Sequence, residues 1–231
     1  MKTLSEIRHE ARMALNGHWT QPVLATFIYL LLVSAFQLPT YLITDPNLRL
    51  VCSLVSGCIA LPFAVFFSSP LAFGYQNALL DLTRGCPNSE ETIGNMFAIA
   101  FSWKYWRVVG TQLLVGIYTF LWSLLLLIPG IIKHYAYSMA IYISRDCPDI
   151  PIDDCIYLSR KLMNGYKFKL FLLELTFIGW ALLCILTLGI GLLWLCPYIH
   201  CSYAKFYDTL KAERMGDDPI DIVLQRYRTN S

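Results

Sequence analysis

Long apolar stretches alternate with short polar stretches along most of the chain. A helix rises about 1.5 Å per residue, so about 20 apolar residues are needed to cross the roughly 30 Å hydrocarbon core of a bilayer. Candidate membrane segments cover residues 22–43, 50–73, 106–128, 131–144, 170–187 and 192 to about 207. This pattern predicts an all-α, polytopic membrane helix bundle with six transmembrane helices.

Proline, glycine and turn-forming residues mark the ends of these segments. Residues 44–49 form a polar turn between the first two, and Pro129 with Gly130 is predicted to break the chain after the third. Residues 188–191 separate the fifth from the sixth. Pro62 and Pro70 predict kinks within the second segment. Such kinks are tolerated in a membrane because neighbouring helices can bond the backbone carbonyls that proline leaves without a partner.

The fourth segment is the exception, because 14 residues reach only about 21 Å. If it did not cross, Arg145, Arg160 and Lys161 would lie outside, against the preference of Lys and Arg for the cytoplasmic side. We therefore predict that it crosses, tilted or in a locally thinned bilayer, with Lys133 and His134 at the outer interface.

The charge distribution sets the predicted orientation. With six crossings and the amino terminus inside, Arg49 and Lys133 are the only two of the 18 Lys and Arg residues in outer turns. Both termini are therefore predicted to be cytoplasmic. Trp19, Trp103 and Tyr166 then lie at cytoplasmic helix ends, where amphipathic aromatic rings serve as interface anchors.

Composition supports one membrane domain over residues 1–231. Hydrophobic residues make up 56% and charged residues 15% of the chain, with a mean hydropathy of +0.51, which lies outside the usual range of soluble proteins. A net charge of +2 gives no indication of nucleic-acid binding. The eight cysteines contain no CxxC pair: the five in apolar runs are interpreted as packing residues, and the three in predicted cytoplasmic segments as reduced thiols. Of these three, Cys147 and Cys155 bracket an acidic run but match no familiar zinc spacing.

Three short amphipathic segments precede the predicted hairpins. Apolar residues recur at helical spacing within each, and Thr3 with Glu6 forms a capping-box signature in the first. Their apolar positions are Leu4, Ile7, Ala11 and Leu15; Ile93, Phe97, Ala100 and Phe101; and Ile152, Ile156, Ser159 and Met163. We predict interfacial helices on the cytoplasmic side, with caps packed over the bundle as the alternative.

An internal repeat accompanies this plan. Residues 11–18 align with residues 159–166, with Arg, Asn and Gly in register. The chain is thus predicted to hold three pseudo-repeated units of amphipathic helix plus membrane hairpin. The units cover about residues 1–84, 85–146 and 147–211, followed by a cytoplasmic tail at 212–231.

Several motifs carry a resemblance to a known family. They are Ile128-Pro129-Gly130-Ile131-Ile132-Lys133, Tyr135, Tyr137, Met139, Ser159, Leu162, Met163, Gly165, Phe177-Ile178-Gly179-Trp180, Thr187, Gly189-Ile190-Gly191, Pro197-Tyr198, Ala204, Phe206 and Tyr207, with Ala14, Leu15, Gly17 and Trp19 near the start. The chain resembles the bacterial membrane-protein family catalogued as domain of unknown function number 975. The resemblance implies a multi-helix protein of the bacterial cytoplasmic (inner) membrane without a known activity, and it carries over no catalytic residues. Residues 145–155, with two cysteines and four aspartates, depart from it.

Polar residues inside predicted spans give the candidate site. Glu174 lies about one turn inside the fifth segment, and the sequence places His200 and Lys205 at a similar depth. We predict that Glu174 pairs with one of them in a cytoplasm-facing polar pocket, since an intramembrane carboxylate needs a cationic partner or a proton. Gln112, Gln76 and Asn77 fall at the same level. The alternative is that Glu174 reaches the headgroups or only locks two helices together.

The sequence contains no GxSxG, Walker A or HExxH motif, so an enzyme, a cofactor and a metal site are not expected. The favoured function is a non-enzymatic structural or accessory membrane protein. Membrane lipids are its expected partners, with other membrane proteins or self-association as alternatives. A small-solute or lipid transporter with a polar pocket is the alternative function, because transporters are often built from repeats.

Overall fold

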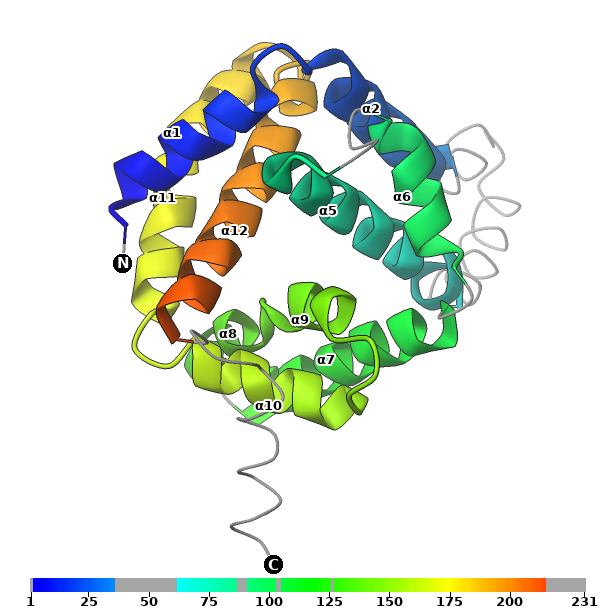
Figure 1. The fold of residues 1–231 in the computed structure, drawn as a ribbon, viewed down its shortest axis with the longest axis vertical. Helices are drawn as coiled ribbons and strands as arrows, with labels where there is room; N and C mark the ends of the chain where they lie inside the picture. The colour runs from blue at the N-terminus through cyan, green and yellow to red at the C-terminus, as the bar shows by residue number, and fades with distance from the viewer. Residues whose placement is uncertain (1, 36–61, 87–90, 103–104, 126, 215–231) are drawn as a thin grey trace, which may run out of the picture.

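The computed structural model describes residues 2–35, 62–86, 91–102, 105–125 and 127–214, and in these ranges all regular structure is helical (Figure 1). The predicted all-α fold is confirmed there. The helices are α1 (Leu4–Leu15), α2 (Thr20–Ala35), the π-helix η1 (Ala64–Ser68), α5 (Ser69–Arg84), α6 (Thr92–Ala100), α7 (Tyr105–Leu125), α8 (Leu127–Tyr137), α9 (Ala140–Asp146), α10 (Ile152–Leu162), α11 (Lys167–Leu186) and α12 (Leu192–Arg214). The described residues leave out the predicted polar turn at 44–49 and the part of the second predicted segment that precedes Pro62. They also leave out Cys52 and Cys58.

Two described helices, α7 and α11, are long and apolar enough to cross a membrane. The candidate spans are Tyr105–Leu124 and Lys167–Leu186, close to the third and fifth predicted segments. Only 17% and 22% of their apolar windows are buried in the protein. Their apolar side chains therefore point mainly away from the protein core, unlike those of a core helix in a water-soluble domain.

α12 is the central element of the fold. It packs against α1, α2, α5, α10 and α11, and in Figure 1 it runs between α11 and α5. Phe206 and Tyr207 on α12 are buried, and the Tyr207 ring stacks on that of Tyr142 from α9 with centroids 5.3 Å apart. The carboxy-terminal hairpin thus supplies much of the core against which the other helices pack.

Two helices continue beyond the predicted ends. The second segment was predicted to end at about Phe73, but α5 continues to Arg84; the sixth was predicted to end at about Tyr207, but α12 continues to Arg214. Hydropathy missed these ends because polar residues interrupt both runs. In α5 the helix is stabilised by burial of Ala78, Leu79 and Leu80. The irregularity expected near Pro70 takes the form of η1 immediately before it.

The short helices α1, α6 and α10 occur where the amphipathic pattern predicts them. The capping box of α1 is confirmed: the Thr3 side chain accepts from the Glu6 N–H, and the Glu6 carboxylate accepts from the Thr3 N–H at 2.7 Å. Most of the predicted apolar positions are buried or half-buried, with Ile7 and Ala100 at 0% and Ile156 at 4% exposure, whereas Phe101 at the end of α6 is 47% exposed. The prediction that these faces rest in lipid headgroups is therefore wrong for the buried positions, and the alternative of caps over the bundle is correct.

Pro129 and Gly130 do not break the chain as predicted, because both lie inside the first turns of α8. Proline is tolerated there, since the first N–H groups of a helix have no intrahelical partner. Gly130 allows a close approach of α7: a Cβ at this position would lie 2.4 Å from the Ser123 hydroxyl oxygen and 2.8 Å from the Ser123 Cα. The motif thus serves helix packing.

The fourth predicted segment is divided between α8, with 11 residues, and α9, with 7. Neither is among the candidate spans of the described chain. Lys133 lines a cavity of about 280 Å³ together with Arg160, Lys161 and Lys167. The prediction that Lys133 lies on the opposite side of the membrane from these cations is therefore wrong; its side chain reaches them from α8.

The two aligned Asn-Gly pairs adopt the same local geometry. Gly17 has φ +87° after α1, and Gly165 has φ +83° after α10. Glycine is favoured in this left-handed conformation, which ends a helix and redirects the chain. The larger three-unit repeat stays a prediction. The turn expected at residues 188–191 is present between α11 and α12.

Candidate functional site

Glu174 on α11 is half-buried and is held by two tyrosines. Its carboxylate accepts hydrogen bonds from the hydroxyl groups of Tyr135 on α8 and Tyr203 on α12. The predicted pairing with His200 or Lys205 is wrong, because no ion pair within 4 Å joins Glu174 to either described side chain. Hydrogen bonds from tyrosines satisfy the carboxylate instead and connect three helices.

His200 lies beside this cluster without bonding Glu174. Its ring makes edge contacts with Tyr75 and Tyr203, at centroid distances of 5.3 Å and 6.2 Å, and its Nδ1 is buried without a described hydrogen-bond partner. Lys205 points elsewhere and donates to the backbone carbonyl of Thr83 at the end of α5. A cationic side chain at this position stabilises the negative end of the α5 dipole.

The remaining predicted residues do not converge on Glu174. Asn77 is buried and its Nδ2 donates to the Phe73 carbonyl one turn back at 2.8 Å, while its Oδ1 has no described partner. Gln76 and Gln112 are partly exposed, and no described hydrogen bond joins either to Glu174. The structure thus brings Glu174 and His200 close to Tyr203. The other predicted site residues are not part of this cluster: Lys205, Asn77, Gln76 and Gln112.

Sequence reasoning missed both tyrosines. Tyr135 belongs to the quoted family motif, and Tyr203 lies three residues after His200 on the same helix. A search for hydroxyl donors as well as cations would have found them, because a carboxylate accepts equally from either.

Removal of one hydroxyl from this cluster gives a testable effect. Tyr203→Phe is expected to lower the free energy of unfolding by about 1–2 kcal/mol, because Glu174 loses a donor in a water-poor site. Tyr118→Phe is the matched control, since Tyr118 lies on the exposed side of α7 and has no described hydrogen bond. Thermal unfolding in detergent measures both. Equal midpoints for the two variants would contradict a stabilising role of the Tyr203–Glu174 contact.

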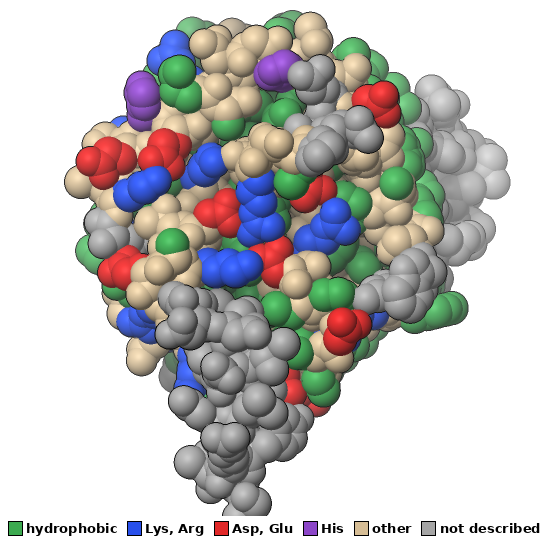
Figure 2. Space-filling view, in the orientation of Figure 1, with side chains coloured by type: hydrophobic (Ala, Val, Ile, Leu, Met, Phe, Trp, Pro, Cys, Tyr) green, Lys and Arg blue, Asp and Glu red, His purple; other side chains and the backbone are tan. Residues whose placement is uncertain are grey.

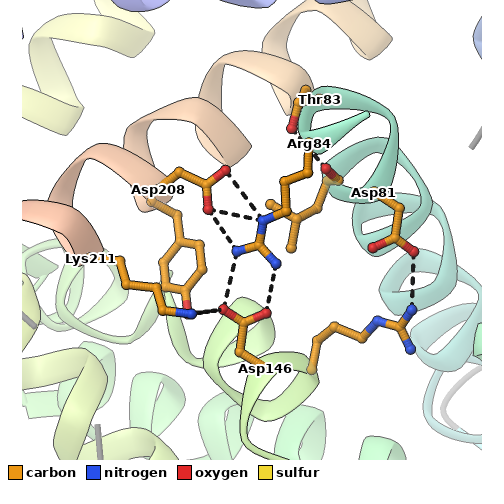
Figure 3. A network of polar contacts seen from close by, with 9 residues as sticks. Asp81, Thr83, Arg84, Asp146, Asp208 and Lys211 are labelled. Atoms are coloured by element: carbon orange, nitrogen blue, oxygen red, sulfur yellow. Dashed lines mark hydrogen bonds and ion pairs between the residues drawn. The ribbon is translucent and has the colours of Figure 1, made fainter. Parts of the chain in front are cut away.

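A second polar cluster joins α5, α9 and α12 (Figure 3). Arg84 donates to both Asp146, at 2.8 Å and 3.1 Å, and Asp208, at 2.6 Å. Asp146 also accepts from Lys211 and, at 3.0 Å, from the Tyr207 hydroxyl. Such two-pronged arginine–carboxylate contacts fix geometry as well as charge. We call Arg84, Asp146, Asp208 and Lys211 the ionic lock.

Asp146 is the centre of the ionic lock. Its side chain is only 9% exposed. Burial acts to raise the pKa of Asp146, but hydrogen bonds from Arg84 and Lys211 outweigh burial and lower the pKa to about 2. Asp146 is therefore ionised at neutral pH. The sequence shows that residues 145–155 are acidic. It does not show that Asp146 pairs with Arg84, because Arg84 lies 62 residues earlier and no local pattern connects the two.

Charged side chains of both signs lie on the face of the protein that Figure 2 shows. Figure 2 shows acidic and basic side chains intermixed across the middle of the viewed face. Arg145 adds to this region through an ion pair with Asp81 at 3.0 Å. The charges pair with each other, so the region is organised as a neutralised surface rather than as a field of one sign.

Comparison with known proteins assigns part of the chain. Residues 123–214 match the family model described as "Protein of unknown function (DUF975)". Over these residues the chain is similar to that family. The matched part contains α8 to α12, and thus Tyr135, Glu174 and Tyr203 as well as most of the ionic lock. No curated protein and no solved structure matches the chain.

Proposed function

We propose that this protein, which is similar to the DUF975 family over residues 123–214, is a multi-pass protein of the bacterial inner membrane with a non-enzymatic, structural or accessory role. It acts through the surrounding lipids, and both of its termini lie in the cytoplasm. The six crossings belong to this proposal, with the fourth made by α8 and α9 together and with Lys133 near Arg160, Lys161 and Lys167 rather than at the outer interface. Lipids are the favoured partners because exposed apolar side chains are numerous on α7, α11 and the start of α12.

The observation that supports the proposal most strongly is the outward direction of apolar side chains. Leu124 on α7, Leu186 on α11 and Leu188 in the following turn are among the most exposed residues, with Leu188 at 93%. Contiguous apolar surface of this kind is unfavourable in water, whereas a bilayer solvates it. The spans are also long enough for the hydrocarbon core.

The ionic lock supports a structural rather than a catalytic role for the charged face. Each of its four side chains bonds another member, so acids and bases neutralise each other at a junction of three helices. Catalytic groups instead need an accessible reacting atom. We assign the charged face to the cytoplasm because Lys and Arg residues are preferred on the cytoplasmic side of a membrane, which is also the basis of the orientation predicted from the sequence.

Membrane fractionation tests the proposal. The full chain is expected to sediment with membranes, to resist alkaline carbonate and to be released by mild detergent. Lipid extracts of proteoliposomes containing the protein should keep their composition on incubation, as measured by mass spectrometry. Release by carbonate would contradict membrane integration, and new lipid species absent from protein-free vesicles would contradict a non-enzymatic role.

A lipid or small-solute transporter is the second candidate, supported by the Glu174–tyrosine cluster inside a candidate span. Intramembrane carboxylates commonly serve transport paths. Under this alternative, Glu174→Gln should abolish the movement of a fluorescent phospholipid across proteoliposome membranes while lowering the unfolding midpoint no more than Tyr203→Phe does, because glutamine keeps the shape and one acceptor. Under the favoured function, wild type and variant move the probe no faster than empty vesicles.

A further inference from the structure

An open cavity of about 660 Å³ lies between α1, α11 and α12. In Figure 1, α1 lies in front of α11 along one edge of the protein, and both α1 and α11 pack on α12. Polar residues of α1 line one part of the cavity, and residues of the α11–α12 hairpin line the rest as far as its turn, where Thr187 and Gly191 contribute. The cavity is thus elongated along the predicted membrane hairpin.

One end of the cavity is basic. Arg8, His9 and Arg12 line it from successive turns of α1, and no carboxylate is among the described lining residues. Arg8 Nε is buried without a described hydrogen-bond partner. A buried guanidinium atom left unpaired is costly unless an acceptor is provided. The chemistry of this end therefore fits a negatively charged oxygen-rich group.

The carboxylates of α1 do not neutralise these arginines. Glu6 caps the helix by accepting from the Thr3 N–H, and Glu10 is paired with Lys2. α1 is held in this orientation at two points. Lys169 on α11 donates to the Lys2 carbonyl at 2.9 Å, and the Tyr198 hydroxyl on α12 donates to the Arg8 carbonyl at 3.4 Å.

The rest of the cavity is apolar and aromatic. Trp180 and Leu183 contribute from α11 and Trp194 from α12, and all three are well exposed to the surroundings. Trp180 and Leu183 also belong to the exposed apolar side chains of the candidate span α11. A basic end joined to an apolar wall matches a molecule with an anionic head and a hydrocarbon tail.

We propose that this cavity binds an anionic phospholipid of the surrounding membrane, with its phosphate at Arg8 and Arg12 and one acyl chain along Trp180 and Trp194. The inference rests on the proposed membrane function and adds a ligand class and a site to it. The lipid would supply an acceptor to the Arg8 guanidinium, whose Nε has no hydrogen-bond partner in the described protein.

Lipid titration of the detergent-solubilised full chain tests the site. Phosphatidylglycerol is expected to raise the unfolding midpoint in a saturable manner, because a ligand that binds the folded state stabilises it. Phosphatidylcholine with the same chains and inorganic phosphate without chains should each raise it far less. An equal shift with both lipids would contradict recognition of the anionic head, and an equal shift with phosphate alone would show an anion site that needs no lipid.

Variants locate the binding. Arg8→Gln combined with Arg12→Gln should weaken the apparent affinity for phosphatidylglycerol at least tenfold, whereas Arg8→Lys with Arg12→Lys should retain most of it. Arg160→Gln with Lys161→Gln removes the same charge from the other described cavity and should bind like wild type. Equal losses in both glutamine pairs would overturn the assignment. Carbonate extraction of each variant separates this outcome from failure of membrane integration.

Discussion

Asp146→Asn is expected to lower the free energy of unfolding by about 2–3 kcal/mol at neutral pH, which makes it one of the two most damaging substitutions that we predict. The asparagine keeps the shape of the side chain but cannot neutralise Arg84 and Lys211, which both bond Asp146. Chemical or thermal unfolding in detergent measures the effect.

Two further aspartates serve as comparisons. Asp208→Asn should cost less, because Asp208 bonds only Arg84 among the lock residues and is 28% exposed. Asp153→Asn, at an exposed position on α10, should change the midpoint little. If Asp153→Asn were as damaging as Asp146→Asn, the lock would not be the cause.

The effect of Asp146→Asn has a defined pH dependence. The pKa of Asp146 is about 2 in the folded protein and near 3.8 without its partners. A lowered pKa means that the ionised form is favoured in the folded state, so the contribution is complete above about pH 4 and is lost as the pH falls toward 2. The difference in stability between wild type and variant should shrink over that interval and stay constant from pH 5 to 7.

Gly74→Ala is expected to cost about 3 kcal/mol or to prevent folding of the amino-terminal half. A Cβ at Gly74 would lie 2.1 Å from the Met96 carbonyl oxygen and 2.9 Å from the Ala100 Cβ, so α5 and α6 could not keep their crossing. The obstacle is backbone, which cannot move aside as a flexible side chain can. Unfolding midpoints and the yield of folded protein both report the effect.

Gly179→Ala is the matched control for this prediction. Gly179 also lies inside a helix, but a Cβ there would meet no described atom within 4 Å. Alanine has a higher helix propensity than glycine, so this substitution should be neutral or stabilising by up to about 1 kcal/mol. A comparable loss at both positions would show that helix crowding at Gly74 is not the cause.

The sequence predicted the positions of those helices that are determined by residues close to one another in the chain. The capping box at Thr3 and Glu6 and the apolar spacing of α1 and α10 rest on neighbours within one or two turns, and the structure contains both. α7 and α11 followed from their continuous apolar runs. Hydropathy, in contrast, could not show that α5 continues to Arg84, because packing against other helices stabilises its polar end.

The candidate site was only partly predictable, since its contacts are long-range. Glu174 stood out as a carboxylate in an apolar segment, but Tyr135 lies 39 residues away and its hydroxyl carries no charge pattern. Lys205 was expected beside Glu174 at a similar depth, yet depth does not fix rotation about the helix axis, and its side chain bonds Thr83 instead. Pro129 and Gly130 were misassigned because the same residues serve both turns and close helix contacts.

Sidedness of two engineered cysteines tests the central claim, that this chain is a membrane protein with its charged face in the cytoplasm. Leu188→Cys is in the exposed α11–α12 turn, and Asp153→Cys is on α10. The measurement is the increase in labelling by a membrane-impermeant maleimide over that of the parent protein, which has cysteines of its own. The account predicts that intact cells label Leu188→Cys alone and that inverted membrane vesicles label Asp153→Cys alone. Labelling of both positions from the same side would contradict it.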